Sequence, residues 1–332
     1  ATGMDLSQAT IVVQARSATD AESTAATVLA EEIEKRTGIQ MPVSNAMPEN
    51  GPSIVVTSAG PARSPESYTL RSGGSGSQPA VTITGASRRG VLYGVGAFLR
   101  RMEWGKGWLS IASGLSVSSA PASPIRGHQV GYRTTANSWD AWTVAQFDQY
   151  FRELALFGAN SIEDIPFAEA RANPLMKYPR RQMTKSLSSI CQKYGLDYWV
   201  WTPASVDLND KAKRADLLRQ FEEVFDDSVT LTGVFVPGGD PGDNPPELVM
   251  PLLEDIARRL APKHPNAKVW VSMQGFNKER EEWVYRYIEQ NRPAWLGGLV
   301  AGPSSPPISR HRERLPAQYR LRLYPDITHN KI

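Results

Sequence analysis

The sequence lacks several features that would place it in a narrow class of proteins. Its 332 residues include one cysteine, Cys191, so no disulfide can form within the chain. Cys191 lies on the apolar stripe of an expected helix, in the stretch SSICQKYG, where a buried and inert thiol is the expectation. No apolar run approaches the ~18 residues that span a bilayer. The most basic stretch, residues 309–322, is interrupted by Glu, Leu and Pro, so we expect neither a membrane span nor a nucleic-acid partner.

What the sequence contains is typical of a globular protein. Hydrophobic residues make up 41% of the chain and charged residues 21%, and the formal net charge of +3 is spread along it. The first residues, ATGMDLSQ, are typical of a mature N-terminus or of a cloning scar. On the first interpretation a signal has been removed, and we expect a periplasmic or secreted protein. The oligomeric state does not follow from the sequence.

The first part of the chain predicts a compact α/β module over residues 1–120. Helical periodicity is present in residues 19–38 and 88–104. One apolar strand pattern precedes the first of these helices, and the others lie between the two. The expected strands are residues 9–15, 53–58, 67–72 and 80–86. The Ser, Ala and Pro content of residues 116–124 is typical of a domain junction.

Residues 121–332 change to a regular alternation of short apolar strands and amphipathic helices, which is the pattern of parallel βα units. The expected strands are residues 125–132, 159–166, 197–203, 232–240, 268–276, 296–303 and 319–328. The predicted fold is therefore an α/β protein with an N-terminal α/β module and a (β/α)₈ TIM-type barrel. Because such a barrel needs eight strands and typically ~250 residues, we expect this one to lack its last βα unit in this chain.

The active site of a barrel of this kind lies at the carboxyl ends of its strands, in the loops that follow them. The stretch GVFVPGGDPGDNPPE, residues 233–247, ends the fourth expected strand and carries Asp240. Glycines let a backbone approach a ligand closely, and prolines fix the loop, so Asp240 is our first catalytic candidate. Asp243 either binds substrate or caps the following helix.

Two further strand ends carry acids. In NSIEDIP, Glu163 and Asp164 close the second strand, and because alternate residues face opposite ways only one can point into the barrel mouth. Glu163 is our choice, although either acid could instead pair with a basic residue such as Arg171. In YPDITHN, at the seventh strand, Asp326 is a third catalytic candidate that can orient His329.

Trp201, at the end of DYWVWTP, is predicted to offer an aromatic platform to a sugar ring, while Trp199 fills the core. Polar side chains at other strand ends suit the hydroxyls or the carboxylate of a sugar. These substrate-binding candidates are Arg126, His128, Tyr132, Arg133, Gln274, Tyr324 and His329. No metal-ligand pattern such as H-E-x-x-H or paired cysteines is present, so we predict neither a metal nor a cofactor.

Three motifs together resemble one known group of enzymes. The helix start RGVLYGVGAFLRRM is followed by Pro-x-Arg-Gly in SPIRGHQ, and the fourth strand ends in VPGGDPG. This order is similar to the glycoside hydrolases of family 20, the β-hexosaminidases, and more distantly to the family 67 α-glucuronidases. The resemblance implies that Arg126 contacts sugar and that Asp240 orients the acetamide group of a substrate. The family motif reads His-x-Gly-Gly-Asp-Glu, and Pro241 stands where its general-acid glutamate is expected.

Proline supplies neither a proton nor a charge, so the acid comes from another strand or the chain is not an N-acetylhexosaminidase. The predicted function is a glycoside hydrolase that acts on an oligo- or polysaccharide through paired carboxylates, with Asp240 and Glu163 as the leading pair. Two alternatives stay open at this point. One is a carbohydrate-binding barrel that has lost the acid, and the other is a lyase or isomerase acting on uronic acids.

Overall fold

The structure, a computed structural model, describes residues 3–14, 20–58, 64–74, 78–132, 139–167, 174–302 and 304–324. The chain divides into two compact units. The first comprises residues 1–126, 148–160 and 193–196, and the second comprises residues 127–147, 161–192 and 197–332. Within the described residues, no helix has both the length and the apolar character needed to cross a membrane.

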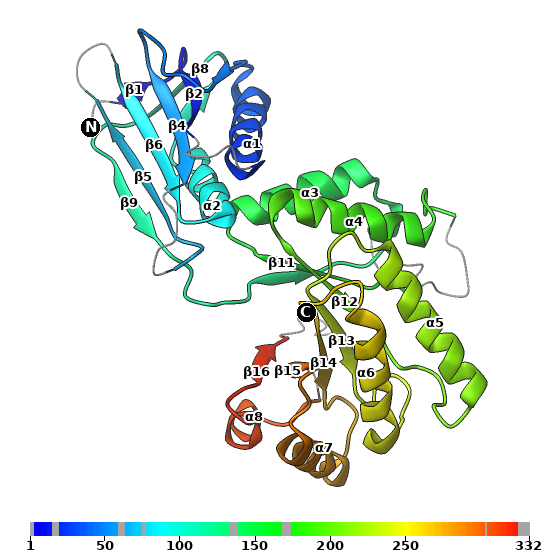
Figure 1. The fold of residues 1–332 in the computed structure, drawn as a ribbon. Coiled ribbons are helices and arrows are strands. Elements are labelled where there is room, and N and C mark those ends of the chain that lie inside the picture. Colours follow the sequence, from blue (N-terminus) through cyan, green and yellow to red (C-terminus); the bar gives the residue numbers. More distant parts are fainter. Residues whose placement is uncertain are drawn as a thin grey trace. The chain divides into compact units, whose positions relative to one another are not determined.

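The first unit is built on a mixed six-stranded sheet, coloured blue to cyan in Figure 1, with the strand order β3-β2-β4-β6-β5-β9. Its first four strands are parallel, and β5 and β9 run antiparallel to their neighbours. Two helices, α1 (Asp20–Thr37) and α2 (Arg88–Leu99), pack on it. The strands are β2 (Thr10–Gln14), β3 (Val43–Ser44), β4 (Ser53–Ser58), β5 (Tyr68–Gly73), β6 (Ala80–Gly85) and β9 (Ser116–Ser119).

Two features of this unit differ from the expectation. The helix predicted over residues 88–104 ends at Leu99, and the chain continues into an antiparallel sheet of β1 (Gly3–Asp5), β8 (Trp108–Ala112) and β7 (Glu103–Gly105). The junction predicted at residues 116–124 begins as strand β9, because this segment pairs with the edge strand β5. Short edge strands of this kind carry little apolar periodicity, which is why the sequence pattern did not reveal them.

The second unit contains the parallel sheet that the alternation predicts. Its seven strands follow one another in chain order and every neighbouring pair is parallel. They are β10 (Gly127–Gln129), β11 (Ser161–Asp164), β12 (Asp197–Trp201), β13 (Gly233–Pro237), β14 (Lys268–Ser272), β15 (Leu296–Ala301) and β16 (Arg320–Leu323). Between them lie η1 (Trp139–Ala141), α3 (Val144–Leu156), α4 (Arg180–Tyr194), α5 (Lys211–Asp227), α6 (Pro246–Leu260), α7 (Lys278–Asn291) and α8 (Ile308–Arg314).

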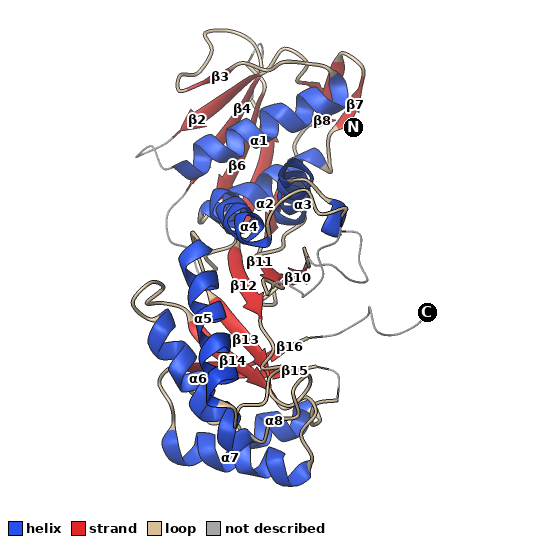
Figure 2. Cartoon of the chain, turned by 90° about the vertical axis from the view of Figure 1, so that its right-hand side faces the viewer, coloured by secondary structure: helices blue, strands red, loops and turns tan. Residues whose placement is uncertain are grey.

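Side chains from distant strands show that this sheet is curled. Glu163 on β11 contacts Arg322 on β16, although β12 to β15 lie between these two strands. At the usual ~4.8 Å between neighbouring strands, five steps across a flat sheet would hold β11 and β16 about 24 Å apart. The contact is therefore made across the inner, concave face of a half-barrel, and Figure 2 shows helices α5, α6 and α7 beside the sheet. The predicted combination of an N-terminal α/β module with a parallel, barrel-type sheet is confirmed.

Candidate active site

The loop between β13 and α6 presents Asp240 to solvent. Asp240 is exposed, while the strand that precedes it is buried from Gly233 to Pro237. Its Oδ2 accepts a hydrogen bond of 3.4 Å from Nε2 of Gln274, in the neighbouring loop after β14. The structure thus brings together two of the predicted site residues at the carboxyl ends of adjacent strands.

The glycines before Asp240 serve a different purpose from the one we expected. Gly238 and Gly239 are buried, and a Cβ built on Gly238 would lie 2.4 Å from the carbonyl oxygen of Ser272. A Cβ on Gly239 would lie 2.8 Å from the ring of Phe276. Close packing of this loop against the end of β14 and the loop that follows it requires glycine here, whether or not a ligand also approaches.

Asn244 joins the same loop to the one after β12. Its Nδ2 donates to the carbonyl oxygens of Ala204 (3.0 Å) and Val206 (2.8 Å), and its Oδ1 accepts from the backbone of Leu208 (3.0 Å). Asn244 is 4% exposed, so these bonds replace water that it has lost. The exposed Asp240 is therefore carried by a loop that is fixed on both sides.

Asp243 has a partner of its own on helix α7. Its Oδ1 lies 2.8 Å from a guanidinium nitrogen of Arg280 on α7, and its φ of 47° is in the left-handed region. It does not cap α6, whose N-cap is Pro245 and has no side-chain capping bond. A role in substrate binding stays a prediction for this residue.

The two acids at the end of β11 face opposite sides of the sheet. Asp164, on the outer side, is fully buried against α4, where its Oδ2 accepts from Arg180 and, at 2.7 Å, from the hydroxyl of Tyr198. Burial, together with the charge of Asp164, raises the pKa of Tyr198 well above its usual range. Glu163 is the acid on the inner face, as the alternation of the strand predicts.

Both carboxylate oxygens of Glu163 nevertheless have partners within the protein. It is 1% exposed, its Oε2 pairs with the guanidinium of Arg322, and its Oε1 accepts from Nε2 of Gln129 at 2.9 Å. Arg322 is 7% exposed and its Cζ lies 4.4 Å from the centroid of the Trp199 ring. Sequence reasoning missed Gln129 and Arg322, because only the curl of the sheet places them beside Glu163.

Aromatic side chains cover much of the inner face. Trp199 is 4% exposed and its ring centroid lies 5.3 Å from that of Trp270 on β14, so it belongs to the core as expected. Trp201, two residues further along β12, is half-buried. Tyr324 follows β16, and its hydroxyl donates to Oε1 of Gln129 at 2.6 Å. Trp201 and Tyr324 thus lie half-buried at the carboxyl ends of their strands, and a contact with sugar stays a prediction for both.

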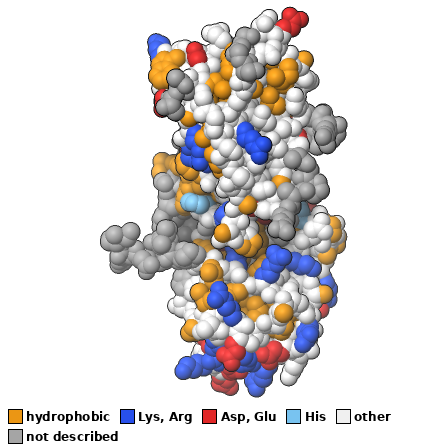
Figure 3. Space-filling model, turned by 90° about the vertical axis from the view of Figure 1, so that its left-hand side faces the viewer, with side chains coloured by type: hydrophobic (Ala, Val, Ile, Leu, Met, Phe, Trp, Pro, Cys, Tyr) orange, Lys and Arg blue, Asp and Glu red, His pale blue; other side chains and the backbone are white. Residues whose placement is uncertain are grey.

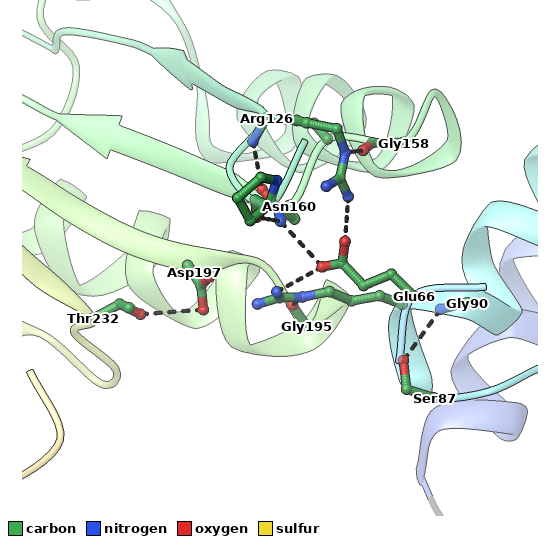
Figure 4. A network of polar contacts seen from close by, with 12 residues as sticks. Glu66, Ser87, Gly90, Arg126, Gly158, Asn160, Gly195, Asp197 and Thr232 are labelled. Carbon is green, nitrogen blue, oxygen red and sulfur yellow. Dashed lines mark hydrogen bonds and ion pairs between the residues drawn. The ribbon is translucent and has the colours of Figure 1, made fainter. Parts of the chain in front are cut away.

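Arg126 lies at the other end of its strand. It precedes β10, and its guanidinium donates to Glu66 (2.6 Å), to the carbonyl oxygen of Gly158 (2.7 Å) and to the hydroxyl of Tyr93 (2.9 Å). Glu66 also accepts from Arg89 at 3.0 Å, and Figure 4 shows Arg126 and Glu66 facing each other within this network. Because chemistry in barrels concentrates at the carboxyl ends of strands, we leave Arg126 out of the proposed site.

The remaining candidates are placed as follows. His128 is exposed and pairs in register with Ile162, on the opposite face of the sheet from Gln129. Tyr132 is fully buried, and its hydroxyl donates to the carbonyl oxygen of Tyr178 at 2.9 Å. Neither is brought together with Asp240. Three candidates lie outside the described residues: Arg133, Asp326 and His329.

The surface of α7 and α8 carries both basic and acidic side chains. At the lower end of the view in Figure 3, basic and acidic side chains lie side by side. Glu282 on α7 pairs with Arg314 on α8 at 2.8 Å, which is typical of this mixed surface. Within the part of the chain that the structure describes, no group of three or more His, Cys, Asp or Glu side chains could hold a metal ion.

Comparison with known proteins assigns the fold. Residues 2–115 match the model of glycosyl hydrolase family 20, domain 2. The N-acetyl-beta-hexosaminidase of Streptomyces plicatus, solved with Thio-NAglucal, superposes with a TM-score of 0.65 over 91% of this chain and 71% of its own, at 12% identity. The chain has the fold of family 20 β-hexosaminidases.

Two other solved structures extend this likeness. The chitobiase of Flavobacterium johnsoniae gives a TM-score of 0.67 at 12% identity, over 98% of this chain and 57% of the chitobiase. A family 138 enzyme targeting pectin rhamnogalacturonan II gives 0.59 at 14% identity, over 88% of this chain and 47% of its own. A search of curated protein sequences gives no significant match. At such identities the likeness is one of fold, and the activity has to be argued from the site.

Proposed function

We propose that the chain is a glycoside hydrolase acting on an oligo- or polysaccharide, with Asp240 as the central carboxylate of its site. The observation that carries this proposal is the setting of Asp240. It is exposed at the carboxyl end of a buried strand, on a loop whose backbone packs against one neighbouring loop and whose Asn244 side chain is hydrogen-bonded to the other. A catalytic group held in place before the substrate arrives needs no ordering when the substrate binds.

Trp201 supports a carbohydrate as the substrate class. The half-buried indole lies at the end of β12, the strand next to β13. Aromatic rings stack on the apolar face of a pyranose, and those at strand ends near a carboxylate are suited to hold a sugar beside it. Solved relatives of the same fold include hexosaminidases bound to GlcNAc, which is consistent with this class.

The second carboxylate of the proposed mechanism is Asp326, in place of Glu163. Both oxygens of Glu163 are engaged and its side chain is 1% exposed, so it is poorly suited to exchange protons with a substrate. Asp326 follows Tyr324 by two residues in the segment after β16. A hydrolase of the two-carboxylate type needs carboxyl groups on either side of the scissile bond, about 5–5.5 Å apart for retention and about 6.5–9.5 Å for inversion.

A specific observation favours one alternative, a carbohydrate-binding barrel without hydrolytic activity. Pro241 follows Asp240 directly, at the position where the resemblance to family 20 places the general acid. If no other group supplies the proton, the chain binds a sugar and does not cleave it. A periplasmic or secreted location, in which either function would meet polysaccharide, stays a prediction.

A panel of substrates separates these functions. The chain would be incubated with 4-nitrophenyl glycosides, including N-acetylhexosaminides and uronides, and with natural oligosaccharides, while binding of the same sugars is measured by calorimetry. Release of nitrophenol or of new reducing ends supports the hydrolase, and heat of binding without cleavage supports the binding barrel. An unsaturated uronide product, detected by its ultraviolet absorbance, would instead indicate the lyase. A chain that neither binds nor cleaves any of these sugars would contradict the proposal.

A further inference from the structure

The small antiparallel sheet of the first unit carries an exposed tryptophan in a fixed position. The sheet has the strand order β1-β8-β7, and Trp108 begins β8. Trp108 is 47% exposed, and its five-membered ring lies across Gly105, the residue opposite it on β7. A Cβ at Gly105 would lie 2.3 Å from Nε1 of this ring. One face of the indole therefore rests on the backbone and the other faces solvent, which agrees with an exposure near one half.

The hairpin that carries this tryptophan is held by backbone hydrogen bonds on two sides. In its turn, the N–H of Gly107 donates at 2.8 Å to the carbonyl oxygen of Thr37, the last residue of α1, and Figure 2 shows β7 and β8 beside that helix. On β8, the N–H of Leu109 donates to Oγ of Ser7 at 3.1 Å, and its carbonyl oxygen accepts from the N–H of Leu6 at 3.0 Å. An aromatic ring that is fixed in this way loses little conformational entropy when a ligand stacks on it.

A row of polar side chains lies on the same face of this sheet as Trp108. Side chains two residues apart on a strand share a face, as do those directly opposite on neighbouring strands. Ser110 follows Trp108 by two residues and is paired in register with an acid on each side, Asp5 on β1 and Glu103 on β7. These three residues, the polar row, lie about 7 Å from Trp108, because each residue of an antiparallel strand advances the chain by ~3.4 Å. Asp5 and Glu103 are exposed, and hydrogen bonds from the hydroxyl and the backbone N–H of Ser7 lower the pKa of Asp5.

The opposite face of the same sheet belongs to the core of the first unit. Leu109 and Ile111, which alternate with the outward-facing residues of β8, are both buried. Trp104 pairs in register with Leu109 and so lies on this inner face, although it is also 47% exposed. The two tryptophans therefore have equal exposure on opposite faces of one hairpin, and only Trp108 shares its face with the polar row.

We propose that Trp108 and the polar row form a carbohydrate-binding site of the first unit, which takes a neutral oligosaccharide or a segment of a neutral polysaccharide. Trp108 stacks on the apolar face of one sugar ring. Sugar hydroxyls both donate and accept hydrogen bonds, so the two carboxylates and the serine hydroxyl of the row are suitable partners for them. Asp5 and Glu103 place two negative charges on the row, and Lys106 in the turn opposes one of them, which disfavours a polymer of uronic acids. The site requires no cleavage of a sugar in the barrel.

Affinity electrophoresis of the full chain tests this site. Native gels would contain hydroxyethyl cellulose, glucomannan, galactomannan or, as the anionic polymer, polygalacturonate. The variants would be made in the unaltered chain and also together with Trp201→Ala, which weakens sugar binding in the barrel. We expect at least one neutral polymer to retard the chain in both backgrounds, and Trp108→Ala to lower the affinity by about tenfold. Trp104→Ala is the matched control and should keep the retardation.

Two further variants separate a contact with the ligand from a structural role. Trp108→Tyr keeps a smaller ring and should give an intermediate retardation, and it replaces Trp108→Ala in the comparison should that variant fail to fold. Glu103→Ala should lower the affinity by roughly two- to tenfold, the range of one hydrogen bond. Retardation by polygalacturonate, if present, should be the same with and without Trp108→Ala.

Three results would overturn the proposal. The first is that no neutral polymer retards the chain, and the second is that Trp108→Ala and Trp104→Ala have the same effect. The third is that Trp201→Ala alone abolishes the retardation, which would place all binding in the barrel. The outcome is independent of the proposed hydrolase, because hydrolysis of a 4-nitrophenyl glycoside, if found, should be unchanged in Trp108→Ala.

Discussion

The ends of β11 and β13 both carry acids, yet the protein uses them in opposite ways. At β11 the two acids are buried and each is paired with an arginine: Glu163 with Arg322 on β16, and Asp164 with Arg180 at the start of the next helix, α4. At β13, Asp240 is exposed and its hydrogen bond comes from a neutral amide. The same residue type at equivalent strand ends therefore holds the sheet together in one place and faces solvent in the other.

The difference shows what decides the role of a carboxylate in this fold. Each buried carboxylate at β11 has a counter-charge, and both oxygens of Glu163 are engaged within the protein, which leaves them no room for a ligand. Asp240 is accessible to a ligand because its loop leaves its side chain in solvent. Three predictions in order of decreasing effect test whether this contrast is real.

The largest effect is expected from removing the counter-charge at β11. Arg322→Met leaves Glu163 ionised and unpaired in the core, which should lower the free energy of unfolding by about 3–5 kcal/mol. Urea denaturation followed by circular dichroism measures it. Adding Glu163→Gln to this variant should restore most of the loss, because the pair is then neutral. If the single variant is as stable as the double, the buried ion pair does not hold β11 to β16.

A smaller effect is expected at the loop that carries Asp240. In Gly238→Ala the new methyl group would lie 2.4 Å from the Ser272 carbonyl oxygen, so the two loops must move apart. We expect a loss of stability of about 1–3 kcal/mol, as for overpacking elsewhere, together with a weaker contact between Asp240 and Gln274. Gly73→Ala is the control, since nothing lies within 4 Å of a Cβ at that position. Equal stability of the two variants would show that the loop is not packed as described.

The smallest effect on stability is expected from Glu66, a carboxylate of the first unit that lies at neither of these two strands. Burial favours the neutral form of Glu66, but hydrogen bonds from Asn160, Arg89 and Arg126 outweigh it and hold its pKa below the usual 4.5. A lowered pKa stabilises the fold above the ordinary value, and this stability is lost as the pH falls below 4.5 through the folded-state pKa. Glu66→Gln should cost about 1 kcal/mol at pH 7 and nothing in strong acid. Urea denaturation across this range measures it, and a difference that does not depend on pH would contradict the ionised network.

The sequence was sufficient for the order of strands in the parallel sheet but not for the short strands of the first unit or for the surroundings of single side chains. The alternation of apolar strands and helices predicted all seven parallel strands, because each buried strand of such a sheet is a short apolar run between turns. It also predicted that Glu163 and not Asp164 faces inward. It did not reveal that Arg322, 159 residues away from Glu163, would engage it. That contact depends on the curl of the sheet, which local patterns do not encode.

The glycines before Asp240 illustrate the same limit. Gly238 and Gly239 allow a close approach, and the groups that lie against them are the Ser272 carbonyl oxygen at the end of β14 and the ring of Phe276. Likewise Arg126 matched a family motif, whereas its position at the amino end of β10 commits it to Glu66. Motifs drew attention to these residues, and only the three-dimensional contacts showed their partners within the protein.

The most direct test of the contrast is the activity of Asp240→Asn on an established glycoside substrate. Asparagine keeps the shape of the side chain and removes its titratable group, so we expect kcat/KM to fall by about 10² or more with the unfolding transition unchanged. Glu247→Gln, which neutralises an exposed acid in the first turn of the next helix, is the matched control and should keep full activity. If Asp240→Asn retains the activity of the unaltered chain, or if it fails to fold, Asp240 is a structural residue of the loop and the active site lies elsewhere.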